Sequence, residues 1–169
     1  MNIGIDKFGL AIPKFFLDIR DLAVARNENA NKFLKGLLQL EMSVSPVTQD
    51  IVTLGAAAAH EFLTEEDKKK IDMIIIGTET GIDQSKSASV FIHNLLGIQP
   101  FARCIEIKEA CYGATAGLDF AKKHIENNPD SYVLLIASDI AKYGIDTPGE
   151  PTQGAGSVAM LVTQNPRIL

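Results

Sequence analysis

A cysteine placed between a predicted strand and a predicted helix is the residue best suited to chemistry. Cys111 follows a strand predicted over residues 102–108 and precedes a helix predicted over residues 112–126. At the start of a helix, unpaired N–H groups and the positive end of the helix dipole stabilise a thiolate. Cys111 is therefore a candidate nucleophile, and the alternative is an ordinary cysteine beside a crowded helix.

A glutamate occupies a comparable position after another predicted strand. Glu79 lies between Gly77 and Gly81, directly after the apolar run 72–77. In open α/β sheets, ligand sites form at the carboxyl ends of the strands. A carboxylate placed there can act as a general base, although an exposed loop glutamate would give the same pattern.

The helix predicted after Cys111 is rich in small residues. Gly113, Gly117 and Ala121 are spaced four apart and would form one smooth ridge. Because each glycine in a helix costs about 1 kcal/mol relative to alanine, we expect the ridge to serve close packing. We expect its neighbour to be a helix in a second half of the protein.

The other residues that could bind a metal lack a suitable arrangement. Cys104 lies within the strand predicted over residues 102–108, and its spacing from Cys111 fits neither a metal pair nor a disulfide framework. The three histidines lie on predicted helices without ligand spacing on one face: His60, His93 and His124. We therefore expect no metal site. The glycine-rich segment 144–156 lacks the Lys-Ser/Thr of a phosphate loop and is expected to be a shaped loop beside a site.

These candidates need an architecture that brings strand ends together, and the order of elements predicts one. Strands are predicted at residues 2–12, 72–77, 102–108, 131–137 and 155–163, and helices at 19–25, 31–40, 48–63, 87–96 and 112–126. Alternating strands and helices predict an α/β fold with a mixed, mainly parallel sheet and helices on both faces. No linker or repeat is visible, so one domain over residues 1–169 is expected.

Composition limits the class of partner. The 169 residues are 46% hydrophobic and 22% charged, with a net charge of -5, which is ordinary for a soluble globular domain. This charge argues against nucleic acid. The lysines at 68–70 follow the acidic residues 65–67 and are expected to form a solvated helix end. No signal peptide or membrane span is apparent, so a cytoplasmic location is expected.

Five segments, standing in family order along the whole chain, resemble bacterial hydroxymethylglutaryl-CoA synthases of the thiolase superfamily. They are IGIDK at 3–7, MIIIGTE at 73–79, GIQPFAR at 97–103, EACYGAT at 109–115 and GEPTQGAG at 149–156. The resemblance implies a thiolase-like fold of two similar halves, of which this chain is the amino-terminal one. It also implies a homodimer and a complementary carboxyl-terminal half or chain.

The resemblance further implies roles for individual residues. Cys111 would be acetylated by acetyl-CoA, and Glu79 would remove a methyl proton from the acetyl group. The resulting carbanion or enol would attack the ketone of acetoacetyl-CoA, and water would release hydroxymethylglutaryl-CoA for the mevalonate pathway. Substrate contacts would fall on Thr152, Tyr143 and Asn29, with CoA thioesters as substrates and no further cofactor.

The sequence departs from the family pattern in two places. The family has a Gly-x-Gly-Gln segment where this chain has Gly36-Leu37-Leu38-Gln39. The family histidine belongs to the carboxyl-terminal half, so we expect this chain alone to be inactive. Two alternatives stay open: another condensing enzyme of the ketoacyl synthase type, which lacks the glutamate, and a non-catalytic half-domain that binds CoA.

Overall fold

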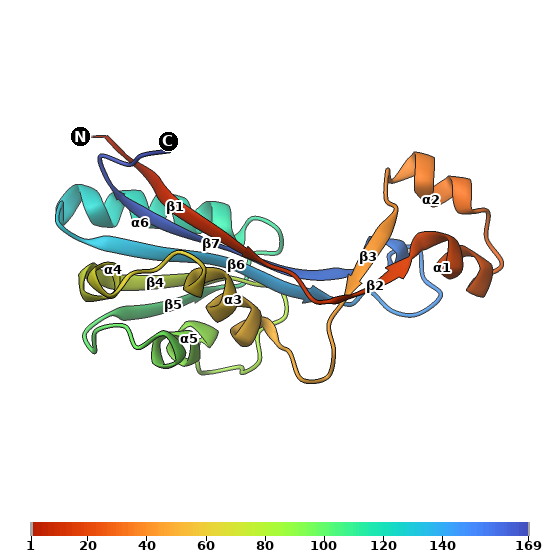
Figure 1. Cartoon of the computed structure of the whole chain (residues 1–169), viewed down its shortest axis with the longest axis horizontal. Coiled ribbons are helices and arrows are strands. Elements are labelled where there is room, and N and C mark those ends of the chain that lie inside the picture. The colour runs from red at the N-terminus through yellow and green to blue at the C-terminus, as the bar shows by residue number, and fades with distance from the viewer. Residues whose placement is uncertain (1, 169) are drawn as a thin grey trace.

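The computed structural model describes residues 2–168 and consists of a five-stranded sheet with a smaller lobe at one end (Figure 1). The order of the strands across the sheet is β1 (Ile3–Ala11), β7 (Gly154–Gln164), β6 (Tyr132–Ala141), β4 (Ile71–Gly77) and β5 (Arg103–Ile107). All five predicted strands are present. The first of them, β1, lies at an edge of the sheet.

The strands of this sheet run in both directions. β4 runs parallel to β5 and to β6, whereas β7 runs antiparallel to β6 and to β1. The sheet is therefore mixed, as predicted, with two parallel and two antiparallel pairs of neighbouring strands. The reason is the connection from β6 to β7, which is a loop: a loop can join antiparallel neighbours, while parallel neighbours need a longer crossover.

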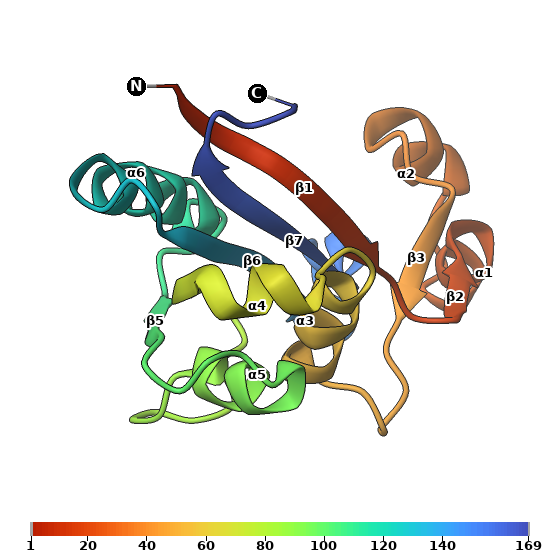
Figure 2. The same cartoon turned by 60° about the vertical axis from the view of Figure 1, so that its left-hand side comes forward.

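Helices cover both faces of the sheet, as predicted (Figure 2). On one face, α3 (Ile51–His60) and α5 (Ala88–Leu96) pack on Ile74 and Ile76 of β4. On the other face, α6 (Gly113–Asn127) packs on Met73 and Ile75 of the same strand. This alternation follows from the two-residue period of a strand, and it buries β4 on both faces.

The small-residue ridge of α6 lies against the chain's own sheet. Gly113, Gly117 and Ala121 are all buried, and a Cβ on Gly117 would lie 2.5 Å from Cδ1 of Leu135 in β6. The expectation that this ridge packs on a helix of a second half is therefore wrong. Its small residues instead let α6 approach β4 and β6 closely, while Phe120 on the same helix is exposed.

The lobe is built from two short strands and two short helices: β2 (Phe15–Asp18), α1 (Ile19–Ala25), α2 (Ala30–Gly36) and β3 (Glu41–Val44). It has an apolar cluster of its own. The prediction for residues 19–25 is confirmed, but the helix predicted over 31–40 ends early. Leu38 has a left-handed φ of 53°, which is incompatible with continued helix, and β3 follows.

The helix predicted over residues 48–63 is also shorter than expected. α3 begins after Asp50, which forms a capping box with Thr53. A separate helix, α4 (Glu65–Lys70), contains the lysine run and pairs it with acidic residues in its first turn. Among the described residues, no helix is both long and apolar enough to cross a membrane.

Candidate active site

Cys111 lies on a tight turn between β5 and α6. The turn is closed by hydrogen bonds from the Tyr112 N–H to the Glu109 carbonyl (3.0 Å) and from the Gly113 N–H to the Ala110 carbonyl (3.2 Å). Ala110 has a left-handed φ of 46°, a conformation that non-glycine residues adopt at a cost. The thiol is exposed just before the first residue of α6, which confirms the predicted strand–turn–helix placement.

The start of α6 touches the end of β4 through backbone atoms. A Cβ on Gly77 would lie 2.4 Å from the amide nitrogen of Ala114, and a Cβ on Gly113 would lie 3.2 Å from the Cα of Gly77. Only glycine fits at position 77, where the obstacle is backbone, and a side chain at position 113 would be tightly crowded. This contact brings the residues that follow β4, including Glu79, beside the residues that precede α6, including Cys111.

Three side chains converge at this point. The Cys111 thiol lies 3.5 Å from Oε1 of Glu79, and the Tyr143 hydroxyl lies 3.4 Å from Oε2 of the same carboxylate. The negative charge of Glu79 is the main cause that raises the pKa of Tyr143; burial and the charges of Cys111 and Asp139 add to it. Thiol, carboxylate and phenol therefore form one group, assembled from the ends of β5, β4 and β6.

Asp139, on the extension of β6 beyond its predicted end, holds the backbone around Glu79. Its Oδ1 accepts hydrogen bonds from the Glu79 N–H (2.7 Å), the Thr78 hydroxyl (2.8 Å), and the N–H and hydroxyl of Thr80 (3.1 and 2.9 Å). Sequence reasoning missed this residue. The signal was available, because Asp139 follows an apolar strand just as Glu79 does, and the carboxyl ends of parallel neighbours meet at one edge.

Tyr143 stands at the start of the loop between β6 and β7, and this loop is braced internally. The Tyr143 N–H donates to Oε1 of Gln153 (2.7 Å), and the Thr147 hydroxyl donates to the Tyr143 carbonyl (2.9 Å). The predicted loop thus has a defined shape and includes a single turn of 3-10 helix, η1 (Glu150–Thr152).

The other two predicted substrate contacts lie apart from the thiol. Thr152 donates its hydroxyl to the Gly149 carbonyl (2.8 Å), and Asn29 caps α2 by accepting from the Asn31 N–H (2.9 Å). Within residues 2–168, no hydrogen bond joins either of them to Cys111, Glu79 or Tyr143. Both are neighbours in sequence of residues that line a cavity of about 260 Å³ between the lobe and the loop. Lys32 and Pro151 are among these lining residues.

The other cysteine and two of the histidines considered as metal ligands are held by burial or by hydrogen bonds away from Cys111. Cys104 is partly buried, and this burial raises the pKa of its thiol. His93 bonds the Gln99 carbonyl and His124 bonds Asp72, at 3.0 and 2.9 Å. Across the described part of the chain, no three His, Cys, Asp or Glu side chains are grouped so as to hold a metal ion.

Comparison with known proteins places the chain beside one group of enzymes. Residues 1–166 match the family model described as the hydroxymethylglutaryl-coenzyme A synthase N terminal domain. The hydroxymethylglutaryl-CoA synthase of Enterococcus faecalis is 59% identical over 169 residues, which is the whole of this chain and 44% of that relative.

Solved structures agree in fold with the chain. A crystal structure of an HMG-CoA synthase complexed with CoA superposes with a TM-score of 0.96 at 60% identity, covering 99% of this chain and 43% of that one. The structure of MvaS in complex with 3-hydroxy-3-methylglutaryl coenzyme A superposes with a TM-score of 0.92 at 40% identity. This match covers 98% of this chain and 41% of that one. The chain thus spans less than half the length of these relatives.

Proposed function

Because the chain belongs to the family of hydroxymethylglutaryl-CoA synthase amino-terminal domains, we propose that it supplies the nucleophile and the base of such a synthase. Its α/β fold is the thiolase-like half that the sequence indicated. The proposed reaction is the condensation of acetyl-CoA with acetoacetyl-CoA to hydroxymethylglutaryl-CoA, a step of the mevalonate pathway.

The observation that carries the proposal is the 3.5 Å contact between the Cys111 thiol and the Glu79 carboxylate. In the first step, the acetyl group moves from the sulfur of CoA to Sγ of Cys111, and CoA leaves as a thiol. Glu79 then removes a proton from the acetyl methyl group, and the carbanion or enol forms the new bond to the ketone carbon of acetoacetyl-CoA. The C=O π bond of the ketone opens in this step, and its oxygen takes up a proton to become the hydroxyl group of the product. Water finally cleaves the thioester to Cys111 and releases the product.

This contact also favours the synthase over the alternatives from the sequence. A ketoacyl synthase lacks the glutamate, so its cysteine would have no such partner. A half-domain that only binds CoA would need neither an exposed thiol nor a carboxylate aimed at it. We assign the cavity between the lobe and the loop, beside Asn29 and Thr152, to the CoA portion of the thioesters. Its lining includes two cations, Arg26 and Lys32, each paired with a carboxylate of the same lining, Glu150 and Glu28.

The experiment uses the complete synthase, in which this chain is joined to its carboxyl-terminal half. Incubation with acetyl-CoA should add one acetyl group to Cys111, as read by peptide mass mapping. Glu79→Gln should leave this acetylation in place and lower the condensation rate by about 10²–10⁴-fold, the usual contribution of a general base. Parental condensation by a folded Glu79→Gln enzyme would overturn the assignment of the base, and acetylation of another residue would overturn that of the nucleophile.

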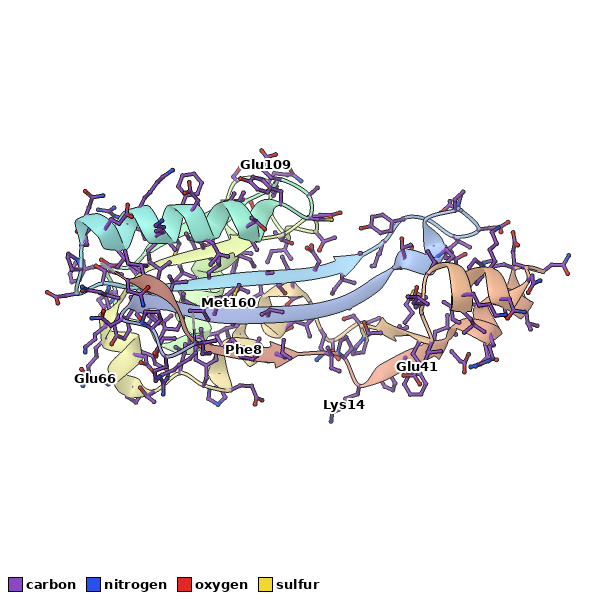
Figure 3. The ribbon with its side chains drawn as sticks, turned by 90° about the horizontal axis from the view of Figure 1, so that it is seen from above. Phe8, Lys14, Glu41, Glu66, Glu109 and Met160 are labelled. Carbon is purple, nitrogen blue, oxygen red and sulfur yellow. The ribbon has the colours of Figure 1, made fainter. Side chains whose placement is uncertain are left out.

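A second half is supported by apolar surface that this chain leaves open. On the α6 side of the sheet, Phe8 pairs with Met160 and Leu10 with Val158, across β1 and β7; Figure 3 labels Phe8 and Met160. Phe8 and Leu10 are 54% and 58% exposed. Exposed apolar side chains in one cluster mark an interaction surface. We therefore propose that the complementary half covers it, and that the isolated chain does not synthesise hydroxymethylglutaryl-CoA. Steady turnover by the isolated chain would contradict this.

The homodimer is proposed from the other edge of the sheet. Within residues 2–168, β5 has a strand neighbour on one side only, and an unpaired strand edge offers N–H and C=O groups to a second copy. Ile105 on this edge is 38% exposed. Light scattering of the complete enzyme should give the mass of two copies, and Ile105→Lys should reduce it toward one. A monomeric parent enzyme would exclude the dimer.

A further inference from the structure

One ion pair connects the lobe to the loop that carries Tyr143. Arg26, directly after α1, donates from Nε and from one terminal nitrogen to the two carboxylate oxygens of Glu150, both at 2.7 Å. The Glu150 side chain is only 7% exposed. Among the ion pairs of residues 2–168, no other spans these two parts of the molecule. Two-nitrogen pairs of this kind fix orientation as well as distance.

Glu150 holds the loop between β6 and β7, and the backbone of this loop packs on Tyr143. Oε2 of Glu150 also accepts the Asp146 N–H at 2.8 Å, so the carboxylate holds the loop on both sides of Pro148. Next to it, a Cβ on Gly149 would lie 2.8 Å from the Cβ of Tyr143. The loop backbone therefore packs directly on Tyr143 and leaves it little room to shift.

At the far end of this series of contacts, the Tyr143 hydroxyl reaches Oε2 of Glu79 at 3.4 Å. We propose that Arg26 and Glu150 are positioning residues of the active site: their ion pair sets the loop so that the Tyr143 hydroxyl stays against the Glu79 carboxylate. The proposal depends on the proposed function only for the role of Glu79 as a base, because the contacts themselves exist in the isolated chain.

A purely structural role is the competing explanation. The pair would then stabilise the junction of lobe and loop without affecting how Tyr143 meets Glu79. Both roles predict a loss of stability when either residue is replaced, so thermal unfolding does not separate them. The two roles differ in what they predict for the surroundings of the Tyr143 phenol.

The test therefore measures the pKa of the Tyr143 phenol by NMR, in the isolated 169-residue chain with isotope-labelled tyrosine. NMR titration follows its three tyrosines, and Tyr143→Phe identifies the signal of Tyr143. Glu79→Gln defines the pKa that Tyr143 has without the neighbouring charge. We expect Glu150→Gln, which keeps the size of the side chain, to lower the pKa of Tyr143 toward that reference.

A matched control removes a comparable ion pair far from the loop. Asp6 accepts from two nitrogens of Arg167 at 2.9 and 3.0 Å, and Asp6→Asn should leave the pKa of Tyr143 at its parental value. A parental pKa in folded Glu150→Gln would overturn the proposal, as would an equal decrease in Asp6→Asn. If Glu150→Gln does not fold, Arg26→Lys decides by the same reading, because lysine retains the charge but not the two-nitrogen contact.

A second reading in the complete enzyme distinguishes this inference from the proposed function. Glu150→Gln should lower kcat for condensation more than it changes the acetylation of Cys111 by acetyl-CoA. If the parental enzyme itself does not condense, the proposed function fails, whatever the tyrosine titration gives. If the parent condenses and Glu150→Gln leaves kcat and the Tyr143 pKa unchanged, the positioning role alone fails.

Discussion

The backbone N–H of Glu79 and the Oδ1 atom of Asp139 are joined by a hydrogen bond of 2.7 Å, so the candidate base is held at its main chain rather than at its carboxylate. Three further donors from Thr78 and Thr80 reach the same oxygen. The side chain of Glu79 thereby stays free for Cys111 and Tyr143, while the residues on either side of it are fixed to β6.

Removing this acceptor should slow condensation. We expect Asp139→Ala to lower the condensation rate of the complete enzyme by about 10-fold or more, since a small displacement of a catalytic group costs large factors in rate. Asp139→Asn should retain more activity than Asp139→Ala, because its amide oxygen can still accept the same hydrogen bonds. Asp119→Ala, on the exposed side of α6, is the control; equal rates for Asp139→Ala and this control would contradict the role.

The two cysteines should differ in reactivity. Near neutral pH, iodoacetamide should modify Cys111 and leave Cys104 largely unmodified, because Cys111 is exposed and burial raises the pKa of Cys104. A raised pKa leaves less of the reactive thiolate. Peptide mass mapping of the native chain gives the result, and Cys111→Ala should abolish rapid labelling. Preferential modification of Cys104 would reverse the assignment.

Acid should weaken the connection between lobe and loop. The hydrogen bonds from Arg26 lower the pKa of Glu150 from its ordinary 4.5 to about 2. A carboxylate with a lowered pKa contributes stability that is complete above the ordinary value and disappears as the pH falls through the folded value. The parental chain should therefore exceed Glu150→Gln in unfolding free energy at neutral pH, and this difference should shrink between pH 4.5 and about 2.

Denaturant unfolding of both chains across this range measures the difference. Since Asp6 and Asp67 also have lowered pKa values, the absolute stability of the parent decreases in acid for several reasons, and only the difference between the two chains reports on Glu150. A difference that stays constant from neutral pH to about pH 2 would contradict this prediction.

Replacement of Leu38 by glycine should stabilise the chain. Leu38 adopts a left-handed φ of 53° and is 85% exposed, so the leucine is strained and buries little. Relief of the strain, about 1–2 kcal/mol, exceeds the entropic cost of the new glycine, about 0.5–1 kcal/mol. Leu38→Gly should therefore raise Tm by about 1–4 °C. Leu37→Gly is the matched control: its φ of −104° suits leucine, and Tm should decrease. A lower Tm for Leu38→Gly would contradict the strain.

The same residue shows where sequence reasoning reaches its limit. The leucines at 37, 38 and 40 continue the apolar spacing of α2, so periodicity predicts a helix that ends at Leu40. The backbone of Leu38 is left-handed instead, and periodicity does not show this. β2 and β3 were missed for a related reason. Each has four residues, too few for alternation to be recognisable, and their pairing is decided by tertiary contact.

The site was more predictable than the lobe. Cys111 and Glu79 follow strands, and a parallel pair places such ends at one edge whatever the details of packing. The contact between the Cys111 and Glu79 side chains depends on the close packing of Gly77 against Gly113. That packing is seen only in the folded structure. The small residues of α6 indicated close packing, but spacing alone does not identify the neighbour, and the sheet proved to be that neighbour.

The backbone contact between Gly77 and Gly113 divides the active site into a stiff part and an adjustable part. Strand end and helix start touch without side chains between them, so thermal motion carries the thiol and the carboxylate together. Tyr143, by contrast, is held through a loop whose shape depends on side-chain hydrogen bonds and the Arg26–Glu150 ion pair rather than on backbone contact. Snapshots of the enzyme along its reaction should therefore agree most closely at residues 77–79 and 109–113, and the small differences between them should fall at residues 143–153.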